Sequence, residues 1–170
     1  KRAFFSGKEE LIAVDLPGAY SMSPFTSEES ITSDYIKQDN PDVIINVVDA
    51  TNLSRSLFFT TQLLELGIPV VVALNKSDIN SKKNTKINID ELSKILLCPV
   101  IETVSTTSGD NGLKDVVAKA VSLKGATQKA LDIFETDDGR TFEEKKKAVY
   151  HALQNIYRKA GWSFNSPGIR

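Results

Sequence analysis

The sequence has few of the residues that build disulfide-rich or metal-centred proteins. Its 170 residues include one cysteine, Cys98, and one histidine, His151. A single cysteine excludes a disulfide within the chain and any multi-cysteine metal site, and a single histidine excludes zinc sites that need a histidine pair. These counts do not exclude a catalytic pair of Cys98 and His151. Cys98 follows an apolar run, however, which favours a buried, unreactive thiol.

The chain also lacks an excess of either charge and lacks long apolar runs. It carries 21 Lys and Arg against 22 Asp and Glu, a net charge of −1, which argues against a basic nucleic-acid-binding surface. No run approaches the roughly 18 apolar residues of a membrane helix, and Lys1-Arg2 does not open a signal peptide. We expect a soluble chain from a reducing compartment, with about one domain's worth of residues.

Methionine is scarce too. Met22 is the only one, and the sequence begins at Lys1. We therefore expect further residues upstream of Lys1 in the translated protein.

Four short apolar runs each end at a polar residue. They are Leu11–Val14 before Asp15, Val43–Val48 before Asp49, Val70–Leu74 before Asn75, and Pro99–Ile101, which leads to Ser105. Short β-branched runs without alternation are typical of strands buried on both faces of a parallel sheet.

Helical patterns alternate with these runs. The predicted helices run from the capping sequence at Thr26 to Lys37, and over Ser56–Glu65, Asp90–Leu97 and Leu113–Leu123. This alternation predicts an α/β fold with a doubly wound, mainly parallel sheet and flanking helices. The pattern changes after Gly125, where a long amphipathic helix is expected over Phe142–Ala160. We predict a domain over residues 1–124 and a linker with a small helical segment over 125–170.

Ligands of open α/β sheets bind beyond the carboxyl ends of the strands, so the residues after the apolar runs are the candidate site. Asp15 and Gly18 form an Asp-x-x-Gly sequence that is weak by itself. After a buried strand, the Asp15 carboxylate could hold Mg²⁺ through water, and the Gly18 N–H could approach a terminal phosphate. Loss of that phosphate would release residues 19–27.

The sequence Asn75-Lys76-Ser77-Asp78 is a stronger signal. The Asp78 carboxylate can accept hydrogen bonds from the ring N–H and the amino group of guanine, a pattern that adenine lacks. Asn75 can bond the other edge of the base or tie loops together, and the aliphatic stem of Lys76 can lie across the ring. A plain surface turn explains the same four residues about equally well when they are taken alone.

Ser105 and Thr106 follow the last predicted strand. Their backbone N–H groups could meet the guanine carbonyl oxygen, and Ser105 could support Asp78. A further strand-end segment, Asp49-Ala50-Thr51, has no role assigned from the sequence.

The order of these segments resembles a translation-factor-type GTPase domain, in particular the cytosolic G domain of the FeoB family of bacterial ferrous-iron transporters. The likeness rests on Val14–Ser21, Asn46–Leu53, Leu63–Pro69 and Ala73–Asp78, and covers about Phe5 to Leu123. It implies a P-loop-GTPase-like fold, GTP or GDP bound by Asn75, Lys76, Asp78, Ser105 and Thr106, and Mg²⁺ and phosphate sensed by Asp15 and Gly18.

The resemblance also implies slow GTP hydrolysis, with no catalytic residue in this stretch. It implies that the protein lies at the cytoplasmic face of the bacterial inner membrane. It also implies that the partner is a membrane-embedded part of the same protein, and that there is no nucleic-acid partner. Homo-oligomerisation stays open. The phosphate-cradling G-x-x-x-x-G-K-[ST] loop and the switch threonine of such GTPases are absent from the sequence.

Two other interpretations remain. The chain could be a P-loop-less pseudo-GTPase that acts as an interaction module without useful nucleotide affinity, because phosphate contacts supply much of nucleotide binding. A related GTPase of ribosome assembly is disfavoured by the net charge of −1.

Overall fold

The computed structural model describes residues 1–6, 9–22, 27–82, 87–107, 109, 111–129, 144 and 151. The chain forms two compact units, residues 1–41 and 42–170. The predicted helix over Phe142–Ala160 lies outside the described residues except for Glu144 and His151, which are both helical.

The first unit contains a β-hairpin and one helix. Strand β1 (Arg2–Ser6) pairs antiparallel with β2 (Glu9–Ala13), and α1 spans Ser27–Asp39. The expectation of a parallel strand buried on both faces at Leu11–Val14 is wrong, because β2 pairs with a hairpin partner and Ile12 is 67% exposed. A four-residue apolar run is too short to distinguish these two kinds of strand.

The segment after Asp15 is hydrogen-bonded to α1 within this unit. The Thr32 hydroxyl donates to the carbonyl of Pro17 at 2.9 Å, and the backbone N–H of Tyr20 donates to the Glu29 carboxylate at 3.3 Å. Both Thr32 and Glu29 are buried. Helix α1 therefore packs on this segment mainly through polar side chains.

The second unit is built on a parallel sheet. The strands are β3 (Ile44–Asp49), β4 (Val70–Asn75) and β5 (Val100–Thr103), and they lie in the order β3-β4-β5. The connecting elements are η1 (Ala50–Asn52), α2 (Leu53–Leu64), α3 (Ser77–Lys82) and α4 (Ile89–Leu96), with α5 (Leu113–Ser122) after the last strand. The predicted α/β class with a mainly parallel sheet and flanking helices is confirmed.

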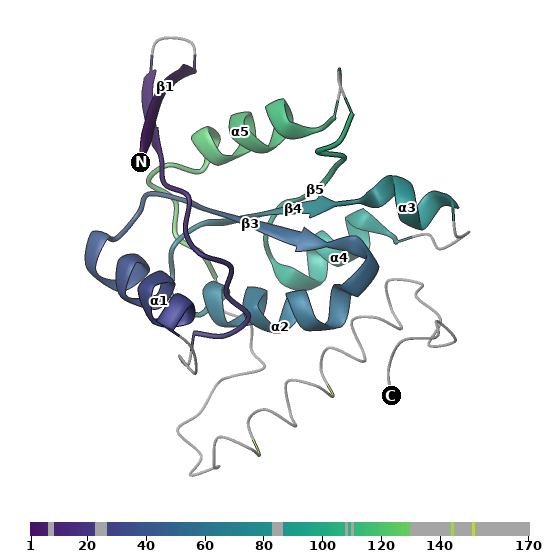
Figure 1. Cartoon of the computed structure of the whole chain (residues 1–170), viewed down its shortest axis with the longest axis horizontal. Coiled ribbons are helices and arrows are strands. Elements are labelled where there is room, and N and C mark those ends of the chain that lie inside the picture. The colour runs from purple at the N-terminus through teal and green to yellow at the C-terminus, as the bar shows by residue number, and fades with distance from the viewer. Residues whose placement is uncertain are drawn as a thin grey trace. The chain divides into compact units, whose positions relative to one another are not determined.

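Helices cover both faces of this sheet: α5 packs on one face, and α2 and α4 pack on the other (Figure 1). Under α5, a core cluster joins Val71 and Ala73 of β4 to Val116 and Ala120. The opposite core contains leucines of α2 and α4 that are at most 1% exposed, namely Leu53, Leu57, Leu63, Leu64, Leu92 and Leu96.

The strands differ in burial, although all were expected to be buried on both faces. Val70–Leu74 of β4 are all buried. In β3 burial alternates, because Ile45 and Val47 lie on the α5 side of the sheet, where α5 covers mainly β4, and Val47 is 65% exposed. The expectation therefore holds for β4 and is wrong for β3.

Two further features bear on the sequence analysis. The segment after Lys76 is the short helix α3, which is not among the helices predicted from the sequence. Within the part of the chain that the structure describes, no helix combines the length and apolar character that crossing a membrane requires.

Candidate functional site

Three polar residues share one rung at the carboxyl edge of the sheet. The strand register pairs Asp49 of β3 with Asn75 of β4, and Asn75 with Thr103 of β5. Parallel strands end at the same edge, so the sequence segments that follow them are neighbours in space. The sequence predicted this neighbourhood for the segments after β3, β4 and β5.

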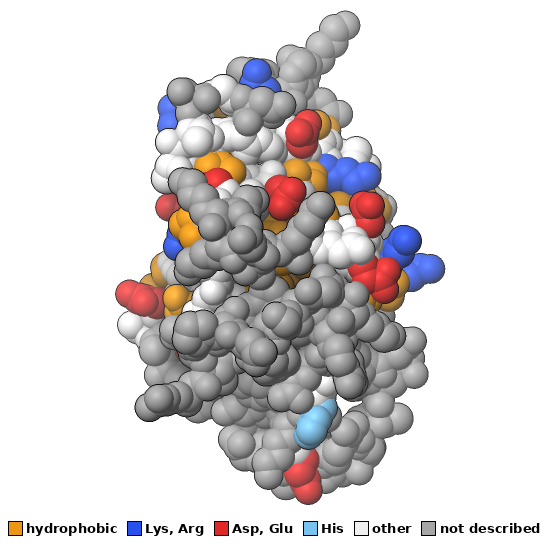
Figure 2. Space-filling model, turned by 90° about the vertical axis from the view of Figure 1, so that its right-hand side faces the viewer, with side chains coloured by type: hydrophobic (Ala, Val, Ile, Leu, Met, Phe, Trp, Pro, Cys, Tyr) orange, Lys and Arg blue, Asp and Glu red, His pale blue; other side chains and the backbone are white. Residues whose placement is uncertain are grey.

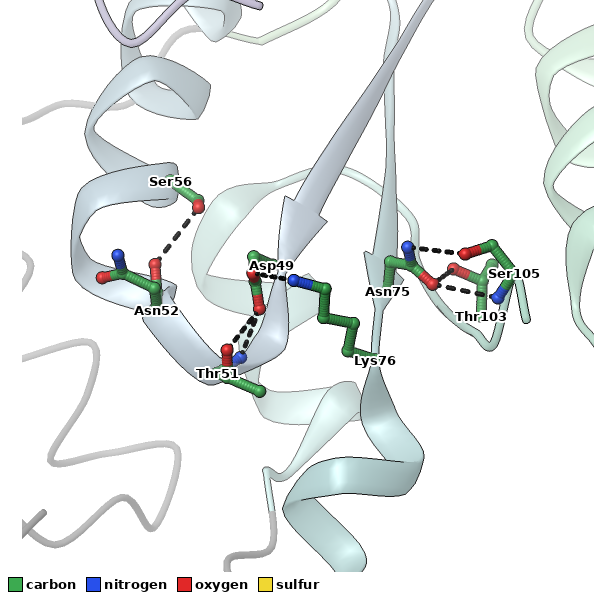
Figure 3. Close-up of polar contacts among 8 residues, drawn as sticks. All are labelled: Asp49, Thr51, Asn52, Ser56, Asn75, Lys76, Thr103 and Ser105. Atoms are coloured by element: carbon green, nitrogen blue, oxygen red, sulfur yellow. Dashed lines mark hydrogen bonds and ion pairs between the residues drawn. The ribbon is translucent and has the colours of Figure 1, made fainter. Parts of the chain in front are cut away.

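Asn75 ties the end of β4 to the loop after β5 (Figure 3). Its Nδ2 donates to the Ser105 hydroxyl at 3.1 Å, and its Oδ1 accepts from the Ser105 backbone N–H at 3.1 Å. The Thr103 hydroxyl lies 3.5 Å from the same Oδ1. Of the two sequence-based roles for Asn75, base contact and loop tie, these contacts correspond to the loop tie. They also mean that Ser105, expected beside Asp78, makes its hydrogen bonds with Asn75.

Asp49 ties the end of β3 to the end of β4. Its Oδ2 lies 2.6 Å from Nζ of Lys76, an ion pair in which both side chains are partly exposed. Its Oδ1 accepts from the backbone N–H of Thr51 at 2.8 Å and from the Thr51 hydroxyl at 2.6 Å, which caps η1. The carboxylate therefore holds a helix start and a lysine at once.

These contacts shift the pKa of both partners. Partial burial raises the pKa of the Asp49 carboxyl, but the hydrogen bonds from Lys76 and Thr51 outweigh it, so the pKa lies below its ordinary value. The hydrogen bond to Asp49, and then its charge, raise the pKa of the Lys76 ammonium. Both groups are charged at neutral pH.

The backbone at Lys76 turns sharply between β4 and α3. Lys76 has φ = +65°, a left-handed conformation that is unfavourable for a residue with a side chain. Its carbonyl accepts the backbone N–H of Ile79 at 3.1 Å, and Asp78 lies half-buried in the first turn of α3. The turn thus places Asn75, Lys76 and Asp78 at the start of one short segment.

The loop after β5 is closed by its own hydrogen bonds. The backbone N–H of Val104 donates to Asn111 at 3.1 Å, and the Asn111 amide donates to the Thr107 carbonyl at 3.2 Å. Ser105 and Thr106 are exposed within this loop. Gly112 ends it with φ = +78°, and a Cβ there would lie 2.1 Å from the Glu102 carbonyl oxygen, so only glycine fits.

Asp15 and Gly18 lie in the first unit, after β2. Asp15 and Gly18 are exposed, and a Cβ added at Gly18 would meet no described atom within 4 Å. The local packing therefore does not itself require glycine at position 18. Among the described residues, no three His, Cys, Asp or Glu side chains gather as a metal site.

Charge at the carboxyl edge is mixed. Figure 2 views the molecule from the side toward which β3, β4 and β5 point in Figure 1, and the described side chains there carry both signs. Among the described side chains in this view, acidic and basic groups both occur, in agreement with the balanced composition. Asp49 ends an apolar run in the sequence, and no function was predicted for it from the sequence alone. Asp49 and Lys76 have opposite charges and lie at the ends of neighbouring strands. This was the signal in the sequence from which their ion pair could have been predicted.

The comparisons with known proteins decide the family. The model of the family described as ferrous iron transport protein B matches residues 1–120. The chain belongs to this family. The Fe(2+) transporter FeoB of Escherichia coli (strain K12) is 50% identical over 107 residues, which are 61% of this chain and 14% of the relative. The chain thus spans about one seventh of the length of the curated FeoB relatives that it matches.

Solved FeoB structures share the fold. The FeoB G-domain from Methanococcus jannaschii is 37% identical with a TM-score of 0.65, covering 71% of this chain and 76% of that one. The mGMPPNP-bound NFeoB from S. thermophilus is 32% identical with a TM-score of 0.63, covering 96% and 68%. The chain therefore has the fold of a FeoB G domain, as its sequence motifs predicted.

Proposed function

We propose that this chain is the guanine-nucleotide-binding G domain of a ferrous-iron transporter, and that it regulates transport. The observation that carries the proposal is the shared rung of Asp49, Asn75 and Thr103, which brings the segments after β4 and β5 together at the carboxyl edge. The S. thermophilus relative described above, which is named as mGMPPNP-bound, supports a guanine nucleotide as the ligand.

The proposed base contacts follow from hydrogen-bond chemistry. Asp78 accepts from the ring N–H and amino group of guanine, Lys76 packs its stem on the ring, and the backbone N–H groups of Ser105 and Thr106 meet the carbonyl oxygen. Asn75 holds the Ser105 loop in position through its two hydrogen bonds at 3.1 Å. Adenine has an acceptor at N1 and a C–H at C2, so it cannot donate these two hydrogen bonds to the Asp78 carboxylate.

The proposed phosphate and Mg²⁺ contacts lie in the first unit. The exposed Asp15 carboxylate is a hard oxygen donor that fits Mg²⁺ through water, and the open surroundings of Gly18 fit a phosphate beside its N–H. Bound Mg²⁺ would neutralise phosphate charge. Because Pro17 and Tyr20 are hydrogen-bonded to Thr32 and Glu29 of α1, we propose that GTP and GDP differ in how they hold α1 and residues 19–27, of which 23–26 lie outside the described residues.

Domain limits, hydrolysis and location are parts of the same proposal. We propose a G domain over residues 1–124, because the family match ends at residue 120 and α5 ends at Ser122, and a linker with a helical regulatory segment over 125–170. We propose slow GTP hydrolysis, placement at the cytoplasmic face of the cell membrane, and coupling to a membrane-embedded part of the same protein. The curated relatives are named Fe(2+) transporters, which supports iron as the cargo.

Equilibrium binding of a fluorescent GDP analogue tests the proposal on the protein expressed from its complete reading frame. GDP should compete and ADP should not. Asp78→Asn should weaken GDP binding by about a hundredfold or more and improve binding of xanthosine diphosphate, whose C2 carbonyl can accept from an amide. Asp90→Asn, which changes an exposed acid in the first turn of α4, is the matched control.

The alternative predicts a different result. A pseudo-GTPase interaction module would show no GDP binding, or binding without preference for guanine. An Asp78→Asn protein with unchanged preference would exclude Asp78 as the base-reading residue.

A further inference from the structure

The ion pair joins Lys76, whose stem is a proposed base contact, to Asp49, which has no part in the proposed base contacts. We propose that Asp49 is a positioning residue for the nucleotide base: it holds Lys76 extended along the carboxyl edge, so that the lysine methylenes form a ready-made surface for the ring. The inference rests on the proposed function, because it concerns the same guanine site.

Asp49 is itself held in place. One carboxylate oxygen accepts two hydrogen bonds from Thr51, at 2.8 and 2.6 Å, and the other faces Lys76 at 2.6 Å. These Thr51 contacts leave the carboxylate with a single orientation. It is therefore an anchor for the lysine and not a free surface charge.

Lys76 and Asn75 extend to opposite sides of the end of β4. In Figure 3, the Lys76 side chain spans from β4 to β3, whereas the Asn75 amide turns toward β5. The Lys76 side chain remains 48% exposed although its ammonium is paired. The side chain is thus fixed at its end and still partly accessible to a ligand.

A lysine stem that is not held loses many rotamers when a base packs on it. That loss of conformational entropy weakens binding, and prior fixation removes part of the loss. The charge of Lys76 is not needed for the contact with the ring, because the stem supplies it. Its charge is needed for the attachment to Asp49.

A double-mutant cycle separates this role from a structural one. Asp49→Asn keeps an oxygen for the Thr51 hydrogen bonds but removes the charge that holds the lysine. Lys76→Met keeps an unbranched apolar stem without the ammonium. GDP affinity is measured for the unsubstituted protein, both single variants and the double variant, all expressed from the complete reading frame.

We expect the loss of GDP affinity caused by Asp49→Asn to depend on the presence of Lys76. Asp49→Asn should weaken GDP binding by about three- to tenfold when Lys76 is present, and by less than about twofold in the Lys76→Met background. The loss should shrink in high salt, because salt screens the exposed pair in the unsubstituted protein. Asp39→Asn, which removes the remote Lys1–Asp39 ion pair of 3.2 Å, should leave GDP affinity unchanged.

The other outcomes each exclude a specific statement. An equal loss in both backgrounds would assign Asp49 to the Thr51 cap alone and overturn the positioning role, as would no loss in either. Absence of GDP binding by the unsubstituted protein would overturn the proposed function, and with it this inference.

Discussion

Asp49 and Lys76 connect the carboxyl ends of two neighbouring strands through a 2.6 Å ion pair. The pair predicts how the free energy of unfolding changes at acid pH. The Asp49 pKa lies below its ordinary value of 3.8, so its contribution to stability is present above about pH 4 and is lost as pH falls through the folded-state pKa. We expect the unfolding free energies of the unsubstituted protein and Asp49→Asn to converge below pH 4, as measured by urea unfolding across pH. Parallel curves throughout would contradict the assignment.

Asn75 should stabilise the loop after β5. Asn75→Ala removes the hydrogen bonds to the Ser105 N–H and hydroxyl, both at 3.1 Å. We expect the free energy of unfolding to fall by about 1 kcal/mol, because water can replace part of these bonds at an exposed loop. Amide hydrogen exchange at Ser105 should accelerate. Ser105→Ala retains the bond from its own N–H and should leave that exchange rate near its original value.

Gly112 provides a test of backbone geometry at the start of α5. Gly112→Ala adds a Cβ at φ = +78° that would lie 2.1 Å from the Glu102 carbonyl oxygen. We expect a loss of more than about 2 kcal/mol in unfolding free energy, from the left-handed backbone and the backbone displacement together.

Gly125→Ala is the matched control for this contact. Gly125 has φ = +80°, and an added Cβ would meet no described atom within 4 Å. This variant should lose only the conformational part, about 1 kcal/mol. Equal losses in both variants would show that the Glu102 contact can relax.

Cys98 should be chemically inert in the folded protein. It is 4% exposed, and burial raises the pKa of its thiol from 9.0 to about 12. We expect reaction with iodoacetamide at pH 8 to be slower by about a hundredfold or more than in denaturant. Because the folded pKa is raised, the thiol stabilises the fold below pH 9, and this contribution is lost as pH rises toward 12. Rapid labelling without denaturant would place the thiol at the surface.

The elements with strong patterns could be predicted from the sequence. Val70–Leu74 is apolar throughout and forms β4, and the start of α5 at Leu113 was predicted to the residue. Weak patterns were less informative. Helix α3 begins Ser-Asp-Ile-Asn, a sequence of low helix propensity, and it follows a turn set by the backbone of Lys76.

The site could be predicted in part for a similar reason. Residue types and their order predicted that Asn75, Lys76 and Asp78 lie together at the carboxyl edge, as the structure shows, and their contact with a base stays a prediction. The Asp49–Lys76 pair depends on the register of β3 against β4, which aligns Asp49 with Asn75. Register is a property of the packed sheet, so the opposite charges of Asp49 and Lys76 indicate an ion pair only once the two strand ends are placed side by side.

The left-handed backbone at Lys76 has a consequence for engineering. At φ = +65° a glycine would relieve local strain, so a search for more stable variants would favour Lys76→Gly. The same change would remove the cation that Asp49 holds. Selection for thermal stability alone would therefore remove a residue of the proposed nucleotide site, and stabilised variants of this domain should keep lysine at position 76.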